Sequence, residues 1–137
     1  MKKIIVVLSV FLLIIGGYTW WSFWEPSEFE EGSIIFELKI PGVIKDFNAI
    51  GAKSSPKYKY RIADGVKPSI ITMSYCSSSS IRKISAYFEN VGLKCENSVD
   101  FHGTKCTGIY EGYYMLALLS SEDNCVDVYA SFEGEGK

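Results

Sequence analysis

The longest apolar stretch of the chain lies at its start, where residues 4–24 carry no charged side chain. As an α-helix this run is expected to be about 31 Å long, close to the ~30 Å hydrocarbon thickness of a bilayer. It ends in aromatic residues of the kind that lie at the level of lipid headgroups, namely Tyr18, Trp20, Trp21, Phe23 and Trp24. The pattern predicts a transmembrane helix over residues 1–24 that acts as a signal-anchor.

A cleaved secretory signal is the alternative, because it also begins with basic residues followed by an apolar run. Signal peptidase requires small residues just after the run. Bulky rings stand there instead, and Gly16 and Gly17 lie deep within the run. This favours a retained anchor over a cleaved, soluble periplasmic form.

Lys2 and Lys3 predict the orientation of the chain, because basic residues stay on the cytoplasmic side of a membrane. The remainder of the chain is then exported. From the short basic start and the compact length we expect a bacterial protein. It is expected to cross the inner membrane once, with its C-terminal domain in the periplasm.

Alternation of apolar and polar residues predicts strands in the exported part. In the first of them, Ile34, Phe36, Leu38 and Ile40 share one face. The predicted strands are 33–40, 57–64, 69–76, 93–99, 105–110, 113–120 and 125–132. Residues 113–119 are apolar on both faces, which indicates the central strand of a sheet.

One amphipathic helix is predicted after the third strand. Its apolar positions recur at helical spacing, and they are Ile81, Ile84, Phe88 and Val91. The serines at 77–80 are candidate N-caps, and Gly92 is expected to end the helix in the left-handed conformation. Residues 43–50 allow one or two further helical turns.

These elements predict an α+β fold in which an antiparallel sheet has one main helix packed on it. The domain is expected to cover residues 33–137. Residues 25–32 are acidic and without periodicity, which indicates a short stalk between this domain and the membrane helix.

The chain has four cysteines, and all of them lie in the exported part: Cys76, Cys95, Cys106 and Cys125. An even number in a small exported domain predicts disulfides. Residues 95–106 can fold back as a hairpin, which favours Cys95–Cys106 and leaves Cys76–Cys125. Zinc binding is disfavoured, because the spacing lacks a C-x-x-C pair and His102 is the only histidine.

The formal net charge is −2, which argues against nucleic acid as a partner. Without Lys2 and Lys3, the remaining 12 basic residues oppose 16 acidic ones, so the exported part carries −4.

The residues indicate no catalytic constellation, and we expect neither an enzyme nor a cofactor or metal. Nucleophilic catalysis needs a base beside the nucleophile, but His102 precedes Gly103 in a predicted turn. Carboxylates that could pair for glycoside chemistry fall in turns or on exposed strand positions: Asp100, Glu111, Asp123 and Asp127.

A basic row on the second predicted strand is the candidate binding surface. Lys57, Lys59 and Arg61 alternate with apolar residues, and a turn with Asp64 follows them. Such a row can meet an acidic partner. It can also be a solvent face that protects a strand from edge aggregation.

The resulting hypothesis is a membrane-anchored periplasmic module that binds another exported or envelope protein. The role that we favour is an immunity or inhibitor protein that neutralises an exported toxin or hydrolase. The alternatives are an accessory subunit of an envelope secretion or surface assembly, and a small-ligand sensor domain.

Overall fold

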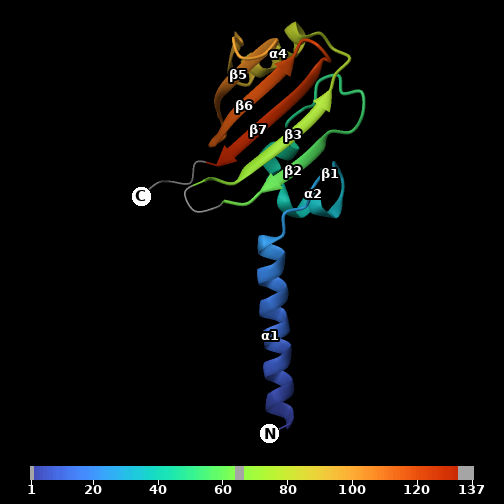
Figure 1. Ribbon diagram of the computed structural model, residues 1–137, viewed down its shortest axis with the longest axis vertical. Helices are drawn as coiled ribbons and strands as arrows, with labels where there is room; N and C mark the ends of the chain where they lie inside the picture. Colours follow the sequence, from blue (N-terminus) through green and yellow to red (C-terminus); the bar gives the residue numbers. More distant parts are fainter. Residues whose placement is uncertain (1, 64–66, 133–137) are drawn as a thin grey trace.

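Seven strands and a long N-terminal helix dominate the fold in the computed structural model, which describes residues 2–63 and 67–132. Helix α1 (Lys2–Phe23) extends away from the rest of the chain as a rod, and the strands form one sheet beyond its C-terminal end (Figure 1). The predicted α+β class, with an antiparallel sheet, one main helix and a preceding apolar helix, is confirmed.

Helix α1 is 22 residues long, and its span Ile4–Phe23 is apolar enough to cross a membrane. The side chains of this span are exposed instead of being packed into the domain. A helix of this kind serves as a membrane anchor or as an export signal.

Neighbouring strands all pair antiparallel, in the order β1-β2-β3-β7-β6-β5-β4. The strands are β1 (Phe29–Glu30), β2 (Lys57–Arg61), β3 (Ile70–Cys76), β4 (Lys94–Asn97), β5 (Gly103–Tyr110), β6 (Tyr113–Ser120) and β7 (Cys125–Phe132). All of them except β1 overlap strands predicted from alternation.

One face of the sheet carries the core. Helix α4 (Ile81–Asn90) packs on this face against β4 and β5, and it buries Ile84 and Phe88 completely. Two short helices, α2 (Ile34–Lys39) and α3 (Gly42–Lys45), also contribute buried side chains. The sheet supplies alternate residues to this core, among them Tyr58, Ile71, Met73, Met115, Ala117, Val126 and Val128.

The predicted helix boundaries agree with α4. Ser80 is the N-cap by its extended backbone, although its side chain makes no capping hydrogen bond. Gly92 follows the helix with φ of 96°, a conformation that costs glycine little because it has no Cβ.

The strand predicted at 33–40 is wrong, because this segment forms α2. The Ser33 side chain accepts a hydrogen bond from the Phe36 amide at 3.2 Å and caps the helix. Phe36 and Ile40 are buried one helical turn apart, whereas Ile34 and Leu38 face outward. Alternation along the sequence instead predicts all four side chains on one face of a strand.

The segment 25–32 is more than the predicted stalk. Pro26 and Phe29 are buried, and β1 pairs with β2 so that Phe29 lies opposite Tyr58. The folded part of the chain therefore begins before Ser33.

The middle strand of the sheet is β7, not β6 as predicted. β6 lies beside it, and its second apolar face carries Leu116 and Leu118 on the side of the sheet away from α4. Its two-sided apolar character therefore does not arise from burial on both faces.

The structure contains two disulfides, Cys76–Cys125 and Cys95–Cys106, which are the pairs expected from the sequence. Each joins residues that lie directly opposite each other on neighbouring strands, β3 with β7 and β4 with β5. Such bonds persist in an oxidising compartment.

Candidate functional site

The side of the sheet away from α4 is a broad surface that we call the open face. None of the helices that the structure describes packs on it, and its side chains are half-buried or exposed. From β2 to β5 it is formed by Lys57, Lys59, Arg61, Ile70, Thr72, Ser74, Asp127, Tyr129, Ser131, Tyr114, Leu116, Leu118, Lys105, Thr107 and Ile109.

An apolar strip crosses the open face on β7, β6 and β5. Tyr129 lies opposite Leu116 in the register, and Tyr114 lies opposite Ile109. Ile109 is 67% exposed and Tyr114 is 47% exposed. With Leu118, these residues place aromatic and aliphatic side chains together where water reaches them, a composition typical of interaction surfaces.

The basic row of Lys57, Lys59 and Arg61 lies on the same face as this strip. The register places these residues opposite Ser74, Thr72 and Ile70, respectively. Tyr58 and Tyr60, between them on β2, face the core. The alternation predicted for this strand is therefore confirmed, and its polar side forms part of the open face.

Glu28 pairs with two members of the basic row. Lys59 Nζ lies 2.9 Å from Glu28 Oε1, and Lys57 Nζ lies 3.7 Å from Glu28 Oε2. The hydrogen bond from Lys59 lowers the pKa of Glu28 most, the charge of Lys59 follows, and Lys57 contributes less. The pairs are solvent-exposed and contribute little stability. Glu30 also lies opposite Lys57 in the β1–β2 register, so the three cations of the row have two carboxylates beside them and keep a small positive excess.

Asp64, the fourth residue of the predicted binding surface, lies outside the described residues, as does the turn predicted at Asp64-Gly65. Arg61 at the end of the basic row has no carboxylate partner within the described part of the chain.

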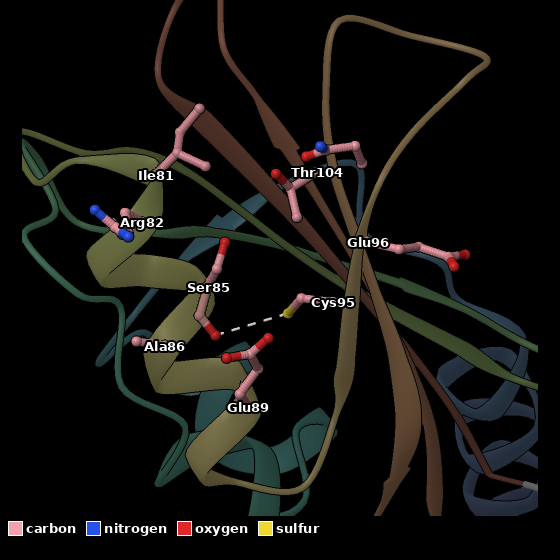
Figure 2. Close-up of a pocket in the computed structure, with 9 residues that line it drawn as sticks. Ile81, Arg82, Ser85, Ala86, Glu89, Cys95, Glu96 and Thr104 are labelled. Carbon is pink, nitrogen blue, oxygen red and sulfur yellow. Dashed lines mark hydrogen bonds between the residues drawn. The ribbon is translucent and has the colours of Figure 1, made fainter.

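A groove of about 640 Å³ separates α4 from β4 on the other side of the molecule. Figure 2 shows Ser85, Glu89 and Cys95 close together in it, with Arg82 projecting from the opposite side of the helix. Cys95 Sγ lies 3.7 Å from the Ser85 carbonyl oxygen. A disulfide sulfur has no proton to donate, so this is a packing contact.

The groove is where a small ligand would bind under the sensor hypothesis, which remains a prediction.

The candidate acid–base groups are spread over the sheet and its turns. The Ser121 hydroxyl donates to the backbone carbonyl of His102 at 2.6 Å, not to its ring. Asp123 caps the turn before β7 by accepting from the Cys125 amide at 3.1 Å. Hydrogen bonds from Ser120 and then from the Cys125 amide lower the pKa of Asp123.

The other candidates lie apart from these two. Asp127 is on the open face, Glu111 is in the β5–β6 turn, and Asp100 is in the β4–β5 loop. Within 4–63 and 67–132, no three His, Cys, Asp or Glu side chains are placed to hold a metal ion.

Comparison with known proteins gives no family: no family model, no curated protein and no solved structure matches the chain. The surface of the molecule is therefore the remaining guide to its function.

Proposed function

We propose that this chain is a membrane-anchored module that binds an acidic surface of another exported or envelope protein through its open face. The observation that supports the proposal is that the basic row and the apolar strip lie on the same uncovered face of one sheet, with β3 between them. Neither feature alone distinguishes a binding surface from an ordinary solvent face.

The two parts of the surface have different expected roles. The apolar strip can bury Tyr129 and Leu116 against a partner, and aromatic residues are frequent anchors in interface centres. The basic row lies to one side of it and is well placed to accelerate encounter with an acidic partner. Because strands support all of these side chains, little conformational entropy is lost on binding.

The proposed location follows from α1 and the disulfides together. An anchor that remains uncleaved would hold the domain at the inner membrane, on its periplasmic side, where disulfides form. The role that we propose there is inhibition of an exported toxin or hydrolase, as an immunity protein. An inhibitor needs only to occupy its target, and a face without a helical cover provides the area.

Binding kinetics of a charge-reversal variant test the proposal. The full chain, solubilised in detergent, is used to capture the partner, and association rates are measured at two salt concentrations. Lys57→Glu with Arg61→Glu should slow association about tenfold at low salt and weaken its salt dependence. Both positions are exposed, so the fold should be retained.

The matched control is Arg82→Glu with Lys83→Glu, which makes the same charge change on exposed positions of α4. It should leave the association rate close to that of the wild type. Equal slowing in both variants would indicate only an effect of net charge and would contradict binding through the open face. Loss of the captured protein's toxic or hydrolytic activity on binding would support inhibition, whereas capture of a secretion component would favour the accessory role.

A further inference from the structure

Helix α2 carries two large apolar side chains on its outer surface. Ile34 is 78% exposed and Leu38 is 65% exposed. Residues four apart lie on the same face of a helix, so these two side chains form one apolar patch. Phe36, on the opposite side of α2, is buried against Tyr58 with ring centres 4.8 Å apart. The helix is therefore apolar both toward the core and away from it.

Helix α2 is fixed to the C-terminal end of α1. Lys39 Nζ donates to the backbone carbonyl of Trp21 at 3.1 Å. The same ammonium lies 5.2 Å from the centre of the Trp21 ring and 5.5 Å from that of Tyr60, which are cation–π distances. Figure 1 shows α2 at the end of the domain where α1 enters it.

The Trp21 contact sets the level of α2 relative to a bilayer. Trp20, Trp21 and Trp24 pack together at the end of α1, and tryptophans at the end of a membrane span lie at the headgroup level. The Lys39 contact holds α2 at this same level. Apolar side chains exposed there can enter the boundary between headgroups and acyl chains.

We propose that Ile34 and Leu38 lie in the lipid interface of the bilayer that holds α1. This inference depends on the retained anchor of the proposed function. It gives the domain a second point of attachment, so that the sheet is held in one orientation above the membrane.

The test uses the full chain in phosphatidylcholine nanodiscs, with an environment-sensitive fluorophore on a single added cysteine. The test position is Leu38→Cys. Val99→Cys is the control for an apolar residue that is 100% exposed, in the β4–β5 loop at the other end of the sheet. Ser9→Cys, within α1, reports whether the anchor is in the bilayer. A non-reducing peptide map verifies both native disulfides in each protein.

Lipids with a nitroxide near the headgroup end of the acyl chain should quench the probe at position 38 and shift its emission to the blue. The probe at 99 should show neither effect, and the probe at 9 should be quenched by a nitroxide deep in the chain. If position 9 is quenched but position 38 behaves like 99, the inference is wrong while the anchor stands. If position 9 is unquenched, both fail. A blue shift at 38 without lipid quenching would indicate a protein neighbour instead of lipid, which also overturns the inference.

Discussion

Ser74 donates a 2.6 Å hydrogen bond to Asp127 Oδ1 across the β3–β7 pair, on the open face between the basic row and the apolar strip. The bond orients a carboxylate that would repel an acidic partner. Removing this negative charge should therefore affect association in the opposite direction to reversing the positive charges of the basic row.

Replacing this carboxylate tests the electrostatic part of the account. Asp127→Asn keeps an oxygen that can accept from Ser74 and removes one negative charge. Association with the captured partner should become about two- to threefold faster at low salt, because a repulsive charge is lost. The rates are compared by stopped flow with those of Glu89→Gln, an equal change on α4 that should have little effect. Slower association of Asp127→Asn would contradict an acidic partner.

The pairing of Glu28 with the basic row predicts a pH effect of known sign. Because the pKa of Glu28 is below its ordinary value of 4.5 in the folded protein, its pairing favours folding at neutral pH. The contribution of the pairing to stability is complete above pH 4.5, the ordinary pKa of this carboxyl group. It is lost as the pH falls from there through the lowered pKa of Glu28 in the folded protein. Lys59→Ala should move the pKa of Glu28 upward in a carboxyl NMR titration. Lys57→Ala is the control and should move it less, because its ammonium is more distant. An equal shift in both would contradict the assignment of Lys59 as the main partner.

The two disulfides should contribute unequally to stability. Cys76 and Cys125 are 49 residues apart, whereas Cys95 and Cys106 are 11 apart. On the chain-entropy model the longer loop is worth about 4 kcal/mol and the shorter about 3 kcal/mol. Removing the first pair by double serine substitution should therefore lower the free energy of unfolding more than removing the second. Urea unfolding of the full chain in detergent measures both, and the reverse order would show that loop length does not control the effect.

The sequence predicted strands well wherever one face of a strand is buried. Tyr58 on β2 and Met73 on β3 occupy buried positions between exposed or half-buried neighbours, so the period of two is visible. The Cys76–Cys125 bond was predicted because one residue ends a strand and the other begins one, whereas the β3–β7 register that places them directly opposite each other comes from the structure. Local periodicity carries this information because burial alternates with the backbone pleat.

Helix α2 was missed for a physical reason. Its outward residues Ile34 and Leu38 are apolar, so the helical period of the buried residues was hidden in an apparent alternation. An amphipathic pattern indicates a helix only when the outward-facing residues of the helix are polar. Ser33, which caps α2, was the available signal for a helix start.

The open face could be predicted only in part. The basic row was found from its alternation, but the apolar residues of β6 were attributed to a central strand. Sequence alone does not tell whether a second apolar face is covered by another layer of the fold or left open. The pairing of β2, β3, β7 and β6, which brings the two parts of the surface together, depends on long-range register.

Site-specific photocrosslinking is the strictest test of binding through the open face, because it identifies the binding surface before the partner is known. A photoreactive benzoylphenylalanine replaces Tyr129 at the centre of the open face, or Lys83 on the exposed side of α4, in the full chain expressed in cells. We expect a discrete adduct from position 129 that diminishes when Lys57→Glu and Arg61→Glu are added, and none from position 83. An adduct from position 83 with none from position 129 would contradict binding through the open face.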